Sequence, residues 1–205
     1  MVAMAALLNE CAPEVSPVLM QALVRSESSW RPFAIGMDKS QGAAKQPSSL
    51  SEAIATAKGL AAAGRKFSVG LAQIHVSNVA LYGMTWEQAF DACQNLAVGQ
   101  KILWNFYYRA SASGYSGVAA VWAALRGYNS GSVDRAISDD YANRIFAYMS
   151  SAPAPVQISG ALPLIRAPAG PINPSTVVAT QGHPAKTQRS GESLDIFEKN
   201  RAGGF

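Results

Sequence analysis

Apolar residues recur at three- and four-residue spacing through most of residues 1–150, a period typical of helices that bury one face. Start and stop signals frame these segments: Ser16 precedes Pro17 at the first start, Gly64 follows the second segment, and Asp91 opens the third. No alternating strand pattern and no Asn-Gly hairpin turn is present. The sequence therefore predicts an all-α domain, with helices expected over residues 16–28, 49–64, 91–109, 118–126 and 140–149.

The composition changes near residue 150. Of the 18 aromatic residues in the chain, only Phe197 and Phe205 lie beyond this point, whereas seven of the eleven prolines do. A segment so poor in large apolar side chains buries little surface. We therefore expect one folded domain over residues 1–150 and a disordered, Pro- and Ala-rich tail over residues 151–205.

Charge and hydropathy exclude several classes of protein. Hydrophobic residues make up 49% and charged residues 15% of the chain, and the net charge is +4. The basic residues are scattered, so we expect no binding to nucleic acid. No apolar run is long enough for a membrane span, and the first residues lack the basic flank of a secretory signal. His75 and His183 have no second ligand nearby in sequence, so we predict no metal and no cofactor.

The two cysteines, Cys11 and Cys93, lack the spacing of a metal or redox motif. They form either one disulfide bridge or two buried thiols. A bridge would close a long loop and would require an oxidising compartment.

Glu27 is the candidate for acid–base chemistry. It follows Leu19 by eight residues and Leu23 by four, so it lies on the apolar side of the predicted first helix. Partial desolvation there would raise the pKa of its carboxyl group and let it hold a proton near neutral pH. Alternatively, Glu27 is a solvated residue at a helix end, which is the commoner case for glutamate.

Three sequence blocks in fixed order favour the first interpretation. They are Glu27-Ser28 with Pro32-Phe33-Ala34-Ile35-Gly36, then Ser68-Val69-Gly70-Leu71-Ala72-Gln73-Ile74, and then Ala124-Leu125-Arg126-Gly127-Tyr128-Asn129-Ser130-Gly131. Together they resemble the signature of the soluble lytic transglycosylases, a lysozyme-like family. Residues 11–13, Gln46-Pro47 and residues 90–96 are similar to the small branch of that family in type IV secretion systems. Ala72 departs from the methionine that is usual in the second block.

The resemblance implies a lysozyme-like helical fold and cleavage of peptidoglycan glycan strands. Glu27 would protonate the β-1,4 bond between N-acetylmuramic acid and N-acetylglucosamine and then accept a proton from the muramic C6 hydroxyl, which leaves a 1,6-anhydro sugar. Most glycosidases use two carboxylates, but the matched blocks contain only one. Asp38, Asp134, Asp139 and Asp140 lie outside them, and the last three are expected to cap helices.

The resemblance also implies the supporting residues. Ser28, Gln73, Tyr128 and Asn129 would bind substrate, with the hydroxyl of Tyr128 directed at Glu27 or at the acetamido group. Tyr141 belongs to a weaker fourth block and would line the site. The resemblance further favours a Cys11–Cys93 disulfide and a periplasmic location.

Partners implied by the same branch are the envelope components of a type IV secretion system, for whose assembly the wall would be opened locally. Within the tail, Ser193-Leu194-Asp195-Ile196-Phe197 is the stretch expected to dock on such a partner. Two alternatives remain open: a hydrolase of the same fold in which water attacks, and a glycan-binding scaffold without catalysis.

Overall fold

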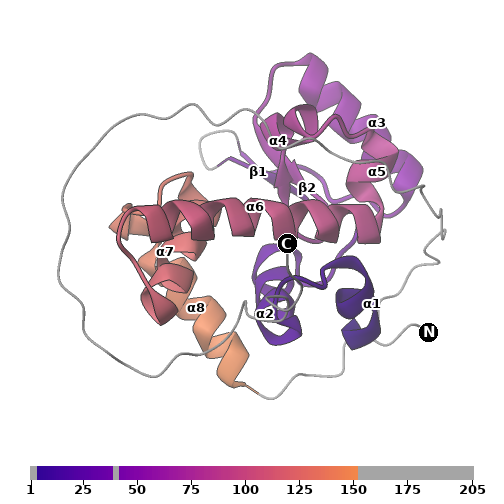
Figure 1. Ribbon diagram of the computed structural model, residues 1–205. Coiled ribbons are helices and arrows are strands. Elements are labelled where there is room, and N and C mark those ends of the chain that lie inside the picture. Colours follow the sequence, from indigo (N-terminus) through magenta and orange to yellow (C-terminus); the bar gives the residue numbers. More distant parts are fainter. Residues whose placement is uncertain (1–3, 39–41, 152–205) are drawn as a thin grey trace, which may run out of the picture.

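A computed structural model of the chain describes residues 4–38 and 42–151, which form a helical body with one small sheet (Figure 1). The expected tail lies outside the described residues except for Ser151. The helices are α1 (Met4–Cys11), α2 (Pro17–Ser28), α3 (Leu50–Ala62), α4 (Val76–Leu81), α5 (Trp86–Phe90), α6 (Ala92–Ala112), α7 (Gly117–Ser130) and α8 (Asp139–Ser150), with a 3-10 turn, η2 (Ala136–Ser138), before α8.

The five predicted helices are confirmed as α2, α3, α6, α7 and α8, whereas α1, α4 and α5 were not predicted. Ser16 precedes α2 at the N-cap position, although its side chain makes no capping hydrogen bond. The side chain of Asp91 accepts a hydrogen bond from the backbone N–H of Gln94, which satisfies one of the free donors at the start of α6. Gly64, two residues after α3 ends, has a φ of 64°, a left-handed conformation that favours glycine.

The expectation that the domain has no strands is wrong. β1 (Ile35–Met37), β2 (Phe67–Val69) and β3 (Ile74–His75) form an antiparallel sheet in that order. Each strand is two or three residues long, whereas alternation becomes a usable signal over about four to eight residues. In register, Gly36 pairs with Ser68, and Ser68 pairs with His75.

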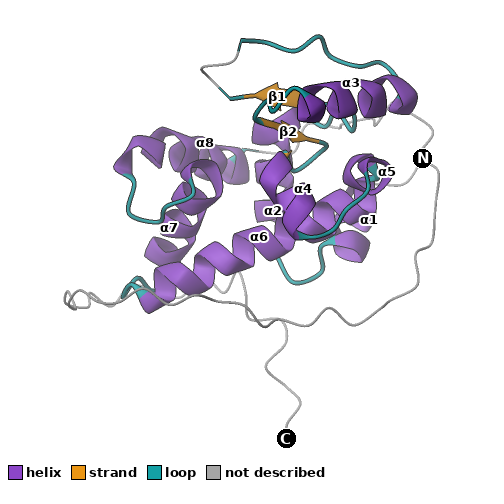
Figure 2. Cartoon of the chain, turned by 90° about the horizontal axis from the view of Figure 1, so that it is seen from above, coloured by secondary structure: helices purple, strands orange, loops and turns teal. Residues whose placement is uncertain are grey.

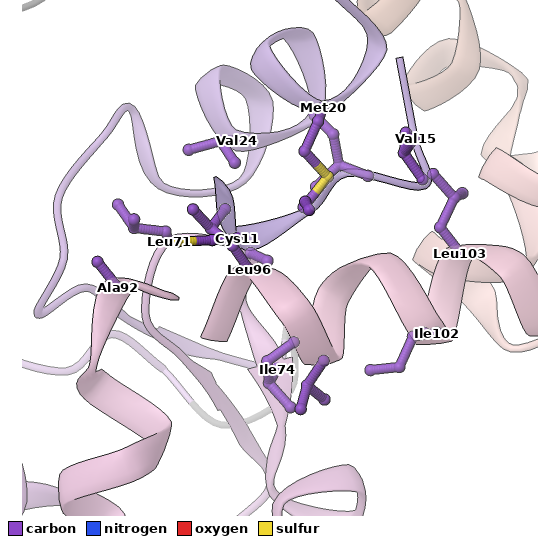
Figure 3. Packing of buried hydrophobic residues seen from close by; sticks show 14 of the residues in the cluster. Cys11, Val15, Met20, Val24, Leu71, Ile74, Ala92, Leu96, Ile102 and Leu103 are labelled. Atoms are coloured by element: carbon purple, nitrogen blue, oxygen red, sulfur yellow. The ribbon is translucent and has the colours of Figure 1, made fainter. Parts of the chain in front are cut away.

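The long helix α6 runs through the middle of the molecule and organises the core (Figure 1). It packs against α7 on one side and against α1, α5 and β3 on others. Figure 3 shows residues of this core, where Met20 and Val24 of α2, Leu96 and Leu103 of α6, and Ile74 of β3 gather. All five side chains are buried. The core therefore joins the helical body to the sheet.

Two contacts between helices bring together segments that are distant in the chain. One of these contacts joins α2 to α8, and the other joins α1 to α6; α7 also packs against its chain neighbours α6 and α8. Seen from above, the sheet with α3 lies at one side of α6, and α7 and α8 lie at another (Figure 2). Among the described helices, none is long and apolar enough to cross a membrane.

Candidate active site

Glu27 lies in the last turn of α2, one residue before the helix ends at Ser28. The helix stops because Ser29 and Trp30 adopt left-handed backbone conformations, with φ of 51° and 64°. Two consecutive non-glycine residues in this region are strained, and such strain concentrates at functional sites. The buried Trp30 ring is part of the core, which holds this turn in place.

Tyr141 of α8 reaches Glu27 across the α2–α8 contact. Its side chain is buried, and its hydroxyl donates a short hydrogen bond to Oε1 of Glu27. Arg144 lies one turn further along α8, so it projects from the same side of the helix. Its Nε donates to the hydroxyl of Ser26 at 3.0 Å. α8 therefore presents one hydroxyl and one positive charge to the end of α2.

The protein raises the pKa of Glu27 from 4.5 to about 7. Burial is the largest cause, because it disfavours the ionised carboxylate. The hydrogen bond from Tyr141 and the charge of Arg144 both lower the pKa and offset part of this effect. The carboxyl group is consequently balanced between its two forms near neutral pH, which suits a group that first donates a proton and then accepts one.

Tyr128 comes from α7 and lies close enough to Glu27 for the carboxylate to influence it. Burial, followed by the nearby carboxylate of Glu27, raises the pKa of Tyr128 well above its ordinary value, so the hydroxyl stays protonated. That hydroxyl donates to the carbonyl oxygen of Ala72 at 2.7 Å and not to Glu27. Tyr128 therefore does not donate to Glu27, and its expected contact with the acetamido group of the substrate stays a prediction.

Gln73 occupies the turn between β2 and β3 with a φ of 49°. Its Nε2 donates to the carbonyl oxygens of Ala34 at 3.2 Å and Gly70 at 2.9 Å. Its Oε1 lies directly over Gly36, where an added Cβ would come within 2.4 Å of it. The carboxamide is thus held against the sheet by its nitrogen, and its oxygen keeps acceptor capacity for a ligand.

The remaining predicted binding residues differ in what the structure allows. Asn129 is exposed at the end of α7, and its Nδ2 donates to the hydroxyl of Ser138 at 3.0 Å. Ser28 is fully buried, and its hydroxyl donates to the carbonyl oxygen of Val24 within α2. Ser28 therefore packs inside the end of α2, and its expected contact with substrate stays a prediction.

Three aspartates outside the matched sequence blocks have partners away from Glu27. Asp38 faces His75, with 3.9 Å between Oδ1 and Nε2. Asp134 accepts from the hydroxyl of Tyr115 at 2.9 Å. Asp139 accepts from Nε1 of Trp122 at 2.8 Å and from Nε of Arg126. The expected capping by Asp134, Asp139 and Asp140 is wrong, since Arg135 occupies the N-cap position of η2 and Ser138 that of α8.

The family model for the transglycosylase SLT domain matches residues 4–148, which is more than half of the chain. The chain belongs to this family. Membership, together with the mostly helical architecture, confirms the lysozyme-like fold class expected from the sequence. No solved structure matches the chain.

Curated relatives of this SLT-domain protein share a name. "Type IV secretion system protein virB1" of Brucella abortus (strain 9-941) is 47% identical over 110 residues, which cover 54% of this chain and 46% of that protein. "Protein virB1" of Agrobacterium fabrum is 25% identical over 137 residues, 67% of this chain and 55% of that protein. The chain thus spans about half the length of the curated relatives it matches.

A disulfide links α1 to α6. Cys11, the last residue of α1, is bonded to Cys93 at the start of α6, 82 positions away. The bond therefore ties the N-terminal helix to the central helix. In the described part of the chain, no group of three or more His, Cys, Asp or Glu residues is arranged to hold a metal ion.

Sequence reasoning assigned no role to Asn95, which the structure places beneath the site. Its side chain is fully buried in α6 and makes three hydrogen bonds to backbone atoms, two at the β2–β3 turn and one in α5. A signal existed, because Asn95 precedes Ile102 by seven residues and so lies on the inner side of the helix. An amide at such a position needs buried polar partners.

Proposed function

We propose that this protein is a peptidoglycan lytic transglycosylase in which Glu27 is the single catalytic carboxylate. The observation that carries the proposal is the half-buried Glu27 with a pKa of about 7, held by the hydroxyl of Tyr141. Membership of the SLT domain family supports a glycan strand as the substrate.

In the first half of the reaction, Glu27 acts as a general acid. Because Oε1 accepts from Tyr141, the acidic proton resides on Oε2. This proton passes to the oxygen that joins C1 of N-acetylmuramic acid to C4 of N-acetylglucosamine, and the bond from C1 to that oxygen breaks. The substrate's acetamido oxygen stabilises the positive charge that develops at C1.

In the second half, the carboxylate of Glu27 acts as a general base. The C6 hydroxyl oxygen of the muramic residue attacks C1, and its proton returns to Glu27. The products are a 1,6-anhydromuramic end and a free C4 hydroxyl, so no water is consumed and the acid is regenerated. Tyr141 and Arg144 stabilise the ionised carboxylate between the two steps. Holding the C6 hydroxyl in place supplies much of the rate.

The surroundings of Glu27 support a mechanism with one carboxylate. The groups that shift its pKa are a tyrosine and an arginine, and Asp38, Asp134 and Asp139 have partners elsewhere. A retaining glycosidase would need a second carboxyl group within about 5.5 Å as a nucleophile. We assign substrate binding to the carboxamide oxygen of Gln73, the hydroxyl of Tyr128 and the exposed side chain of Asn129.

Digestion of purified peptidoglycan, followed by mass spectrometry of the fragments, tests the proposal. Wild-type protein should release 1,6-anhydromuropeptides, and Glu27→Gln should release none while it unfolds cooperatively. Glu10→Gln is the matched control, because Glu10 is an exposed acid on α1; it should retain full activity. Activity in Glu27→Gln comparable to that of wild type would refute the assignment.

The same experiment distinguishes the hydrolase of identical fold. If water attacked C1, the fragments would carry reducing ends about 18 Da heavier than anhydro ends, the mass of one water. Reducing ends as the primary product would overturn the lytic reaction and leave Glu27 as the acid of a muramidase.

We further propose that the enzyme works in the periplasm and opens the wall locally for a type IV secretion system. The name of its Brucella abortus relative supports the secretion role, and the disulfide supports an oxidising compartment. Secretion by cells that carry Glu27→Gln tests whether catalysis is required. Full secretion with that variant, together with loss of secretion on deletion of residues 151–205, would favour a scaffold with the tail as its docking segment.

A further inference from the structure

The carboxamide of Asn95 makes three hydrogen bonds to the backbone and uses both of its N–H donors. Nδ2 donates to the carbonyl oxygens of Val69 at 3.0 Å and Ala89 at 2.7 Å. Oδ1 accepts from the backbone N–H of Ala72 at 2.7 Å. The side chain is fully buried, so these partners have no water to replace it. Asn95 therefore connects α6 and the end of α5 to the β2–β3 turn.

Gly70 is what allows Asn95 to come so close. It has a φ of 79°, and a Cβ added there would lie 2.2 Å from Nδ2 of Asn95 and 2.9 Å from the carbonyl oxygen of Ala89. The glycine of the second sequence block thus makes room for the side chain of Asn95. The side chain of Asn95 can approach the β2–β3 turn because residue 70 is glycine.

Ala72 links Asn95 to the residues of the proposed site. Its N–H is held by Asn95, and its carbonyl oxygen accepts the hydroxyl of Tyr128 at 2.7 Å. The next residue is Gln73, whose carboxamide donates back to Gly70 and Ala34. A displacement of Ala72 would therefore move two groups assigned to the substrate.

Gly99 lies one turn along α6 from Asn95 and leaves room for Ala72 and Tyr128. A Cβ at this position would lie 2.6 Å from Cβ of Ala72 and 3.3 Å from the hydroxyl of Tyr128. On this side of α6, the amide of Asn95 therefore holds the β2–β3 turn, and the missing side chain at Gly99 lets Tyr128 approach.

From this geometry we infer that Asn95 is a positioning residue for the proposed glycan-cleaving reaction, acting through Ala72 on Tyr128 and Gln73. It does not touch the substrate. The inference rests on the proposed function for its catalytic consequence. Its structural half, that Asn95 holds the Ala72 peptide, is independent of any activity.

Asn95→Ala removes the clamp, and Leu96→Ala is the matched control. Leu96 is the next residue of α6 and is equally buried, but its loss leaves the three amide hydrogen bonds intact. Activity is measured per folded molecule, with the folded fraction taken from urea unfolding. We expect Asn95→Ala to lower kcat/KM by about 10- to 100-fold, as displacements of about 1 Å do, and Leu96→Ala to leave it unchanged. Equal values for the two variants would overturn the inference.

A double-mutant cycle with Tyr128→Phe tests the route of the effect. If Asn95 acts through Ala72 and Tyr128, the loss caused by Tyr128→Phe should be smaller in Asn95→Ala than in wild type. Losses that multiply independently would contradict this route.

Hydrogen exchange at the Ala72 amide separates this inference from the proposed function. The amide should be protected in wild type and Leu96→Ala but exchange faster in Asn95→Ala. If wild-type protein proved inactive on peptidoglycan, the proposed function would fail, yet this measurement would still decide whether Asn95 holds the turn. Unchanged protection in Asn95→Ala would overturn the inference even if the enzyme were active.

Discussion

The hydroxyl of Tyr141 donates a hydrogen bond to Oε1 of Glu27, although the two residues are 114 positions apart in the chain. The tyrosine is itself buried, and burial raises its pKa well above its ordinary value, as does the nearby Glu27. Tyr141 therefore remains a donor over the whole physiological range. It lowers the pKa of Glu27 against the larger opposite effect of burial, so the two residues together set the value near neutrality.

The raised pKa of Glu27 should make stability depend on pH. Between 4.5 and about 7 the folded state holds a proton that the unfolded state has released, so stability falls as pH rises through this window. At about 1.4 kcal/mol per pH unit, the ionised group should cost about 3 kcal/mol above pH 7. Urea unfolding of wild type and Glu27→Gln at pH 5 and pH 8 measures this. A difference between the two proteins that does not change with pH would contradict it.

Tyr141→Phe should move the alkaline limb of the pH–rate profile to higher pH. The hydrogen bond that lowers the pKa of Glu27 is lost, so the acid holds its proton longer. The rate should fall about tenfold, as expected for loss of one hydrogen bond to a charged group. Tyr148→Phe, on the same helix and keeping its ring beside Arg25, should leave the profile unchanged. A limb shifted to lower pH would show that Tyr141 does not stabilise the carboxylate.

Gly36→Ala should weaken substrate binding more than it slows catalysis. The new methyl group would meet Oε1 of Gln73 at 2.4 Å, and that flexible side chain would have to move. We expect KM to rise several-fold with little change in kcat. Gly59→Ala in α3 is the control, since a Cβ there meets nothing within 4 Å; it should preserve both constants. An unchanged KM in Gly36→Ala would remove Gln73 from the proposed binding residues.

Loss of the Cys11–Cys93 disulfide should lower stability without altering the chemistry. The bond closes a loop across 82 positions, which the chain-entropy model values at about 4 kcal/mol. Unfolding of wild type should therefore shift to lower urea when a reductant is added, whereas the variant with both cysteines replaced by serine should not respond. A wild-type midpoint unaffected by verified reduction would show that packing alone holds α1 to α6.

The helices α2, α3, α6, α7 and α8 were predictable because their signals are local, whereas α1, α4 and α5 were not predicted. The capping carboxylate of Asp91 and the left-handed Gly64 act within a few residues of themselves. The three strands escaped detection because each is too short to show a period. Even β1 depends on a side chain distant in sequence: Gln46 accepts from the N–H of Ile35 at 3.2 Å and donates to its carbonyl oxygen at 2.7 Å, as a neighbouring strand would.

The order of apolar and polar residues, read alone, determined the helical domain and the side of α2 on which Glu27 lies. The resemblance of its sequence blocks to the lytic transglycosylases implied Gln73 and Tyr128. Only the tertiary structure decided that Tyr141 donates to Glu27, that Tyr128 faces Ala72, that Ser28 is buried and that Asn95 clamps the turn. Burial and hydrogen bonding between segments as far apart in the chain as Glu27 and Tyr141 depend on how helices pack, and helix packing leaves no local period in the chain.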